Sequence, residues 1–262
     1  MNGGISIIGG GNMGGALARG LVAGGLAAAD LTIIEVDAAK RAVLAAQFPG
    51  SRVAGEVLAC SNAVIAVKPA DAEAATRAAV EAGAKTVLSI AAGVTLAKLA
   101  AAAGSGVDVI RAMPNTPALV GEAASGFALG SGCGAEAEAF AAEVLGSVGL
   151  AVRVEESLLD AVTGLTGSGP AYLFFVAEAM IAAGVAEGLP AGTAEALVRQ
   201  LFVGAGRLLA ESPDSPTRLR ENVTSPNGTT AAGLAALSAA GGREAFFAAV
   251  RTATARSAEL GA

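Results

Sequence analysis

A glycine-rich hexapeptide follows the aliphatic run Ile5–Ile8 near the start of the 262-residue chain. It reads Gly9-Gly10-Gly11-Asn12-Met13-Gly14 and fits the pattern G-x-G-x-x-G, with helical spacing of apolar residues after it. In this pattern the first glycine makes a tight turn, the second lets a diphosphate approach the backbone, and the third allows close helix–strand packing. Free N–H groups at the helix start then bind the phosphate oxygens. The hexapeptide therefore predicts a dinucleotide site.

The acidic residue Glu35 follows Gly14 by 21 residues, at the end of the second predicted strand. A carboxylate there accepts hydrogen bonds from ribose hydroxyls and repels a 2′-phosphate, and Asp37 adds a second negative charge two residues later. Taken alone, Glu35 favours NADH over NADPH. Arg41 lies one helical turn further on and is able to accommodate a phosphate, so both cofactors stay open.

Further segments end strands at the carboxyl edge of the predicted sheet, where doubly wound folds bind their ligands. Lys68 supplies a positive charge there, and two prolines hold an irregular loop around Asn115. Small side chains before Gly93 would let a nicotinamide ring lie against the backbone. The residues expected at the cofactor from these segments are Val67, Lys68, Pro69, Ile90, Ala91, Ala92 and Asn115.

A second candidate site lies late in the chain, where Pro226-Asn227-Gly228 signals a turn before a helical stretch at 231–240. Thr229 or Thr230 is expected to cap that helix. A helix start ringed by hydroxyl and free N–H groups binds a carboxylate without a basic side chain. The alternative interpretation is an ordinary well-capped helix.

Short aliphatic runs alternate with Ala-rich helical segments through the first 154 residues, which predicts βαβ units and a Rossmann-like α/β domain. Strands are expected at 5–8, 31–36, 63–67, 86–90 and 107–111, with two more at 126–129 and 151–154. Helices are expected at 12–24, 38–48, 71–81, 96–103 and 135–148.

Residues 155–262 show only helical spacing and predict an all-α C-terminal dimerisation domain. Ser157 and Asp160 resemble a capping box at its start, and long helices are expected at 171–188, 193–211 and 243–260. These helices are apolar around much of their circumference, and so short a domain offers them little partner surface. We therefore expect an obligate homodimer.

The composition excludes several classes of function. The chain has no histidine, which removes His-based acid–base catalysis, His-dependent nucleophiles and His-ligated zinc, and no metal site is expected. Two distant cysteines, Cys60 and Cys133, indicate a reducing cytoplasm rather than a disulfide scaffold. The net charge of −6 argues against nucleic acid or an anionic membrane as partner. The longest uncharged runs are interrupted by Pro, Gly and hydroxyl residues, and the stretch at 161–177 is too short to span a membrane.

Taken together and in this order, these segments resemble the pyrroline-5-carboxylate reductase family, which completes L-proline biosynthesis. The resemblance covers nearly the whole chain and rests on the glycine loop, the Val67-Lys68-Pro69 turn and residues 89–94 and 111–117. Its most specific parts are Asp-Ala-Val-Thr-Gly-Leu-Thr-Gly-Ser-Gly-Pro-Ala-Tyr at 160–172 and the segment at 222–230.

The resemblance implies an NADPH- or NADH-dependent reduction of a cyclic imine to L-proline. It also implies a dimer with interlocked helical domains, which some members assemble into decamers, and a substrate site where the two helical domains meet. Ser225 and the amides at 228–230 would bind the substrate carboxylate, and the Thr230 hydroxyl would hydrogen-bond the ring nitrogen. By position, the substrate residues are Asn222, Val223, Ser225, Gly228, Thr229 and Thr230.

Three positions depart from the family pattern. Asn227 replaces the first glycine of Ser-Pro-Gly-Gly-Thr-Thr, although asparagine tolerates left-handed backbone better than most residues. The segment at 53–56 lacks the asparagine that often contributes to the cofactor site. Glu35 departs from the small or basic residues that suit NADPH.

This chemistry suits a chain without histidine, because a protonated cyclic imine already accepts a hydride and the nicotinamide performs the difficult step. The rival activities are reduction of a related cyclic imine and a hydroxyacid-dehydrogenase-like reaction. The latter generally uses a lysine on a long helix, and residues 155–262 contain none. A dinucleotide-sensing protein that has lost catalysis is a third interpretation, and the intact Ser225 and Thr230 argue against it.

Overall fold

The computed structural model describes residues 4–261, and contacts divide the chain into two units. The first unit holds the residues up to Ser168 together with those from Arg251 on, and the second unit is Gly169–Val250. The predicted boundary at residue 155 marks the change from mixed to purely helical sequence. As a domain boundary it stays a prediction.

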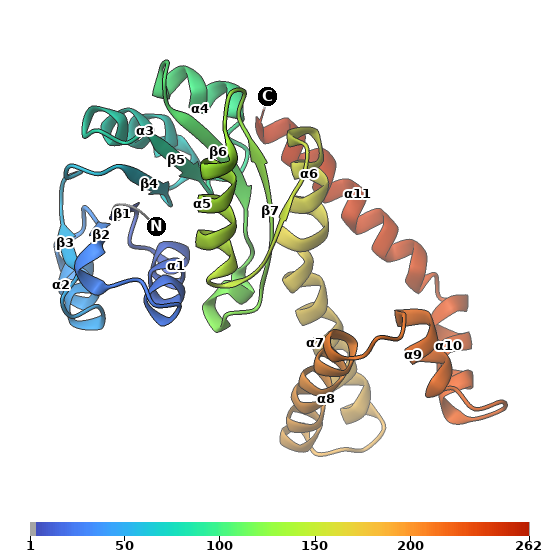
Figure 1. Cartoon of the computed structure of the whole chain (residues 1–262). Helices are drawn as coiled ribbons and strands as arrows, with labels where there is room; N and C mark the ends of the chain where they lie inside the picture. The colour runs from blue at the N-terminus through green and yellow to red at the C-terminus, as the bar shows by residue number, and fades with distance from the viewer. Residues whose placement is uncertain (1–3, 262) are drawn as a thin grey trace. The chain divides into compact units, whose positions relative to one another are not determined.

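An eight-stranded sheet forms the centre of the first unit, in the order β3-β2-β1-β4-β5-β6-β7-β8 (Figure 1). Neighbouring strands are parallel except β6 and β7, because the short β6–β7 connection has no room for a crossover helix. The strands are β1 (Ile5–Ile8), β2 (Leu31–Ile34), β3 (Arg52–Ala54), β4 (Asn62–Ile65), β5 (Thr86–Ser89), β6 (Asp108–Met113), β7 (Ala123–Leu129) and β8 (Gly149–Arg153). The seven expected strands are confirmed, and β3 was missed because three residues at a sheet edge carry no period.

Helices cover both faces of this sheet, as the α/β pattern predicts (Figure 1). One face packs against α1 (Asn12–Ala23), α2 (Ala38–Gln47), α5 (Ala135–Gly146) and the 3-10 turn η3 (Thr116–Val120). The other face packs against α3 (Ala72–Glu81) and α4 (Leu96–Ala103). All four residues of β1 are buried, which explains why three of them are isoleucine.

The chain leaves β8 through a short helical segment made of Glu156–Leu158, α6 (Leu159–Val162) and a π-helical turn at Thr163–Gly167. The expected capping box is wrong: Glu155 is the N-cap, without a side-chain bond, and Ser157 lies inside the first turn. The acid expected in the box is used elsewhere. Asp160 accepts a hydrogen bond from Ser257 at 2.7 Å and lies 3.6 Å from the buried guanidinium of Arg111.

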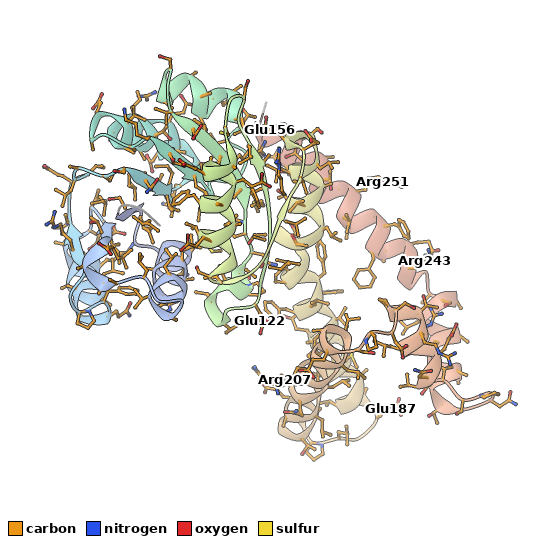
Figure 2. All side chains as sticks on the ribbon, in the orientation of Figure 1. Glu122, Glu156, Glu187, Arg207, Arg243 and Arg251 are labelled. Atoms are coloured by element: carbon orange, nitrogen blue, oxygen red, sulfur yellow. The ribbon has the colours of Figure 1, made fainter. Side chains whose placement is uncertain are left out.

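Glu156, labelled in Figure 2, is the second acid of this cluster. Its Oε1 accepts hydrogen bonds from Arg111 at 3.1 Å and from the Leu96 amide at 2.6 Å. The cluster therefore ties β6, the start of α4, the segment after β8 and the end of α11 (Gly242–Gly261) into one unit. A buried arginine requires such partners, since an unpaired charge in the interior is strongly destabilising.

The second unit contains α7 (Gly169–Ala186), α8 (Ala191–Glu211), α9 (Pro216–Asn222), α10 (Thr229–Ala239) and the first part of α11. The expected long helices are confirmed within a few residues. Helix α9 was not predicted; it is short and polar, and the Ser215 side chain caps its N-terminus. Only Ala194 and Val198 are buried hydrophobic residues in this unit, whereas Phe174 and Phe175 are 64% and 70% exposed. The second unit therefore has almost no core of its own within a single chain.

Among residues 4–261, one helical segment, Glu156–Ala186, is long and apolar enough to cross a membrane by length and composition. It is 31 residues long and so extends well beyond the uncharged stretch at 161–177 on which the sequence argument rested. None of its apolar window is buried within this chain. A helix whose apolar faces are covered by another subunit can have the same length and apolar composition.

Candidate functional site

The glycine loop between β1 and α1 has the geometry that its sequence predicts. Gly9 has a φ of +110°, and a Cβ there would collide with the carbonyl of Ala66. A Cβ on Gly14 would collide with the carbonyl of Gly9, so this glycine allows α1 to pack closely on the turn. By contrast, a Cβ on Gly11 would meet nothing within 4 Å. Gly9 and Gly14 are therefore required by the fold itself, and Gly11 faces open space.

The start of α1 has the features of an anion-binding helix N-terminus. Its N-cap is Gly11, no side chain caps it, and its first turn carries no acidic residue. The first N–H groups of a helix lack intrahelical partners and carry the positive end of the helix dipole. An open cradle with unsatisfied donors fits the diphosphate of a dinucleotide. Met13 packs against the hydrophobic core, so its side chain helps to hold the loop.

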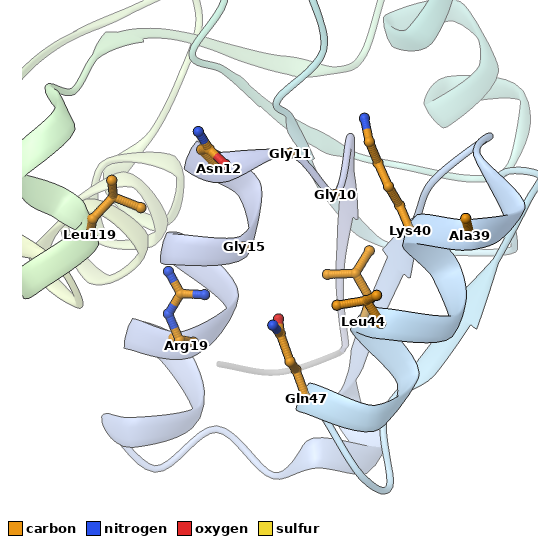
Figure 3. Close-up of a pocket in the computed structure, with 11 residues that line it drawn as sticks. Gly10, Gly11, Asn12, Gly15, Arg19, Ala39, Lys40, Leu44, Gln47 and Leu119 are labelled. Carbon is orange, nitrogen blue, oxygen red and sulfur yellow. The ribbon is translucent and has the colours of Figure 1, made fainter.

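A cavity of about 620 Å³ adjoins the loop, between α1 and α2 (Figure 3). Arg19 and Lys40 bring two positive charges to it, and Asn12 lies at the start of α1 beside the opening. Neither cation was predicted from the sequence, although Arg19 is on the same face of α1 as Asn12 and Lys40 is in the first turn of α2. The remaining lining residues are Gly10, Gly11, Gly15, Ala39, Val43, Leu44, Gln47 and Leu119.

Neighbouring strand ends bring most of the predicted cofactor residues to one edge of the sheet. The amide of Gly9 donates to Ile34, that of Ala66 to Ile8, and that of Ile90 to Ile65, at 2.8, 2.8 and 3.0 Å. The loops after β2, β1, β4 and β5 therefore lie side by side. The strand order reverses direction between β1 and β4, where open α/β sheets bind ligands. This edge carries Glu35, the glycine loop, Val67, Lys68, Pro69, Ile90, Ala91 and Ala92.

Glu35 and Asp37 form a tightly hydrogen-bonded corner after β2. Glu35 is only 8% exposed, and its Oε1 accepts the Asp37 amide at 3.0 Å. Asp37 caps α2, because its Oδ1 accepts the amides of Ala39 and Lys40 at 2.8 and 3.1 Å. These two backbone donors, that of Lys40 foremost, lower the pKa of the Asp37 carboxyl. Asp37 immediately before a predicted helix is the signal that would have identified the cap.

Asn115 has both ends of its side chain engaged. Its Nδ2 donates to the carbonyl of Thr166 at 3.0 Å, and its Oδ1 accepts the amide of Ala124 at 3.0 Å. The residue is buried, with 7% of its surface exposed. Asn115 therefore braces the β6–β7 connection against the helical turn at Thr163–Gly167. A contact between Asn115 and the cofactor stays a prediction.

The second candidate site is the turn from α9 into α10, in the second unit. Asn227 has a φ of +59°, so the asparagine adopts the left-handed backbone that a glycine would otherwise supply. The amide of Gly228 donates to the Ser225 carbonyl at 3.1 Å, and a Cβ on Gly228 would collide with Ser225 Oγ. The turn therefore places the Ser225 hydroxyl beside the start of α10.

The expected capping role of Thr229 or Thr230 is wrong. Gly228 is the N-cap of α10, without a side-chain bond, and both threonines lie within the first turn. Ser225, Thr229 and Thr230 are exposed in the single chain, and Val223 is 61% exposed. Asn222 ends α9 and donates to Asp214 at 3.3 Å. Hydroxyls and uncapped amides thus gather at this helix start, as a carboxylate site requires.

Within residues 4–261, no group of three or more His, Cys, Asp or Glu side chains is placed to hold a metal ion. Cys60 and Cys133 are free thiols. Burial raises the pKa of each thiol, so neither has the depressed pKa of a nucleophilic cysteine.

Comparison with known proteins matches the two parts of the chain to two family models and the whole chain to known reductases. Residues 156–260 match the family described as pyrroline-5-carboxylate reductase dimerisation, and residues 4–93 match NADP oxidoreductase, coenzyme F420-dependent. The pyrroline-5-carboxylate reductase of Pseudomonas aeruginosa is 38% identical, over 98% of this chain and 96% of that protein.

Two solved structures are similar along the whole chain. A pyrroline-5-carboxylate reductase from Coxiella burnetii has 31% identity and a TM-score of 0.94, covering 100% of both chains. The Plasmodium falciparum pyrroline carboxylate reductase, solved with NADP bound, has 26% identity and a TM-score of 0.84, covering 100% of this chain and 99% of that one. With its NADP-binding fold, its helical dimerisation domain and near full-length similarity to these reductases, the chain belongs to the pyrroline-5-carboxylate reductase family.

Proposed function

We propose that this protein reduces 1-pyrroline-5-carboxylate to L-proline, with NADPH or NADH as the reductant. The observation that carries the proposal is the pair of uncapped, glycine-preceded helix starts, α1 and α10, in a chain similar to such reductases over nearly its full length. One start suits the diphosphate of the cofactor, and the other suits the carboxylate of the substrate.

The nicotinamide supplies the hydride, and the residues of the first unit hold the cofactor. Amides of the glycine loop bind its diphosphate, and Glu35 accepts from a ribose hydroxyl. The strand-end segments after β4 and β5 line the path of the nicotinamide, where Ala91 and Ala92 are small enough for a ring to lie on the backbone. Asn115 supports this edge from the side through its bonds to Thr166 and Ala124.

The residues of the second unit orient the substrate. Ser225 Oγ and the free amides of the first turn of α10 bind the carboxylate, with Asn222, Val223 and Thr229 around it. Thr230 Oγ1 accepts a hydrogen bond from the protonated ring nitrogen. Reduction adds a hydride to the imine carbon while the proton stays on nitrogen, so Thr230 holds that proton in place and does not act as a strong acid.

We also propose a homodimer formed through the helical domain, in a cytoplasmic protein. The exposed apolar residues of α7 and α8 support this, because a unit with two buried hydrophobic residues needs outside surface to cover its helices. The larger assembly that we propose is a decamer made of five such dimers. Light scattering separates them, since a dimer has twice the chain mass of 25.1 kDa and a decamer ten times that mass.

Steady-state oxidation of NADPH and NADH tests the activity with 1-pyrroline-5-carboxylate and its six-membered analogue. Reduction of NAD⁺ and NADP⁺ is measured in parallel with a panel of 3-hydroxy acids. The expected result is rapid, stoichiometric conversion of the five-membered imine to L-proline. Oxidation of hydroxy acids without turnover of either imine would instead favour the dehydrogenase interpretation. Binding of the cofactor without any turnover would favour a sensing protein.

A further inference from the structure

Two acidic side chains, Glu35 and Asp37, lie at the corner between β2 and α2. Glu35 and Asp37 are two residues apart, and the Asp37 amide bonds the Glu35 carboxylate. The other oxygen of Glu35, Oε2, lies 3.4 Å from where a Cβ on Gly10 would be. It therefore faces the glycine loop, on the side where the ribose of a bound dinucleotide passes.

The start of α2 is already occupied by a side chain. Asp37 Oδ1 accepts two of its free amides, whereas α1 and α10 have no side-chain cap. A helix start is a backbone site for a phosphate, and a 2′-phosphate next to this corner would find these two amides already occupied. Asp37 thus supplies the anion that a 2′-phosphate would otherwise provide.

The arginine of this corner is also engaged. Arg41 Nη1 donates to the carbonyls of Glu35 and Val36, both at 2.8 Å. Its guanidinium lies over Gly55, where a Cβ would be 3.2 Å from Nη1. Arg41 therefore stabilises the backbone of the corner through one of its terminal nitrogens. Lys40 is the nearby cation that projects into the cavity beside the glycine loop (Figure 3).

From this arrangement we infer that the protein prefers NADH to NADPH, with Glu35 and Asp37 as the residues that determine the preference. Glu35 Oε2 accepts a hydrogen bond from a ribose hydroxyl, and a 2′-phosphate would bring its charge next to two carboxylates. The inference rests on the proposed function and names the cofactor that the same site takes.

Calorimetric binding of NAD⁺ and NADP⁺, beside kcat/KM for NADH and NADPH, tests the preference. The wild type is expected to favour the cofactor without the phosphate by about tenfold or more in both measurements. Asp37→Ser keeps a hydroxyl cap on α2 and removes the charge. It should raise the affinity for NADP⁺ by roughly tenfold and change the affinity for NAD⁺ much less.

Asp30→Asn is the matched control, because Asp30 is an exposed acid at the opposite end of β2. It removes the same charge and should leave the ratio of the two affinities unchanged. Equal or tighter binding of NADP⁺ by the wild type would overturn the inference, as would an unchanged ratio in a folded Asp37→Ser variant. Loss of the proposed function is seen separately, as NAD⁺ binding with no reduction of the imine.

Discussion

The starts of α1 and α10 share their local chemistry but differ in their surroundings. Each follows a glycine N-cap, has no side-chain cap and carries no acid in its first turn. Gly14, Gly15, Ala16 and Leu17 of α1 are buried, whereas α10 has no buried residue. The helix start predicted to bind the cofactor is therefore packed within one chain, whereas the one predicted to bind the substrate is exposed in the single chain.

A third helix shows which part of this pattern matters. The start of α5 also follows a glycine, Gly134, without a side-chain cap, but Glu136 and Glu138 lie in its first turn. These carboxylates already complement the helix dipole, so that start does not attract an anion. A glycine cap is thus informative only where the first turn is also free of acids.

The largest expected effect is on the glycine loop before α1. Gly14→Ala places a methyl group against the Gly9 carbonyl and should destabilise the fold by about 3 kcal/mol, because the clash is with backbone rather than with a side chain that could rotate away. Thermal unfolding measures the loss. Gly11→Ala is the matched control, because its methyl group enters open space. Its free energy of unfolding should lie within about 0.5 kcal/mol of the wild-type value, but it should bind the cofactor weakly. Equal destabilisation by both changes would refute the distinction.

The next effect concerns the exposed apolar surface of the second unit. Phe175→Glu puts a charge on an apolar face of α7 and should raise the dissociation constant of the dimer by roughly a hundredfold. The variant should bind cofactor normally and lose turnover at low protein concentration, as measured by light scattering and steady-state kinetics. Leu150→Glu, at a 64% exposed site in the first unit, is the control and should stay dimeric. A fully active monomer would show that α10 needs no partner.

The smallest effect tests α10 itself. Thr230→Ala should lower kcat roughly tenfold to a hundredfold, because the ring nitrogen loses its hydrogen-bond partner. The dissociation constant of the cofactor should hardly change, since the predicted diphosphate site lies in the other unit. Ser238→Ala removes an exposed hydroxyl further along the same helix and should behave as the wild type. Unchanged turnover in Thr230→Ala would eliminate the proposed role.

Most of the fold could be predicted because strands such as Ile5–Ile8 and helices such as α1 carry their period within one short window. The exceptions are informative. The edge strand β3 and the polar helix α9 are too short for a period to appear. The caps expected from Ser157 and from Thr229 or Thr230 were wrong because local sequence does not show whether a neighbouring residue takes the N-cap position.

The sequence by itself determined the order of the elements, the glycine turn, the left-handed position that Asn227 can adopt, and the two helix starts without nearby acids. All of these depend on residues adjacent in the chain. Only the tertiary structure decided that Asp160 pairs with Arg111 rather than capping a helix, and that Asn115 braces two segments. Those roles depend on partners about fifty residues away, because a buried polar group is satisfied by whatever the fold brings within reach.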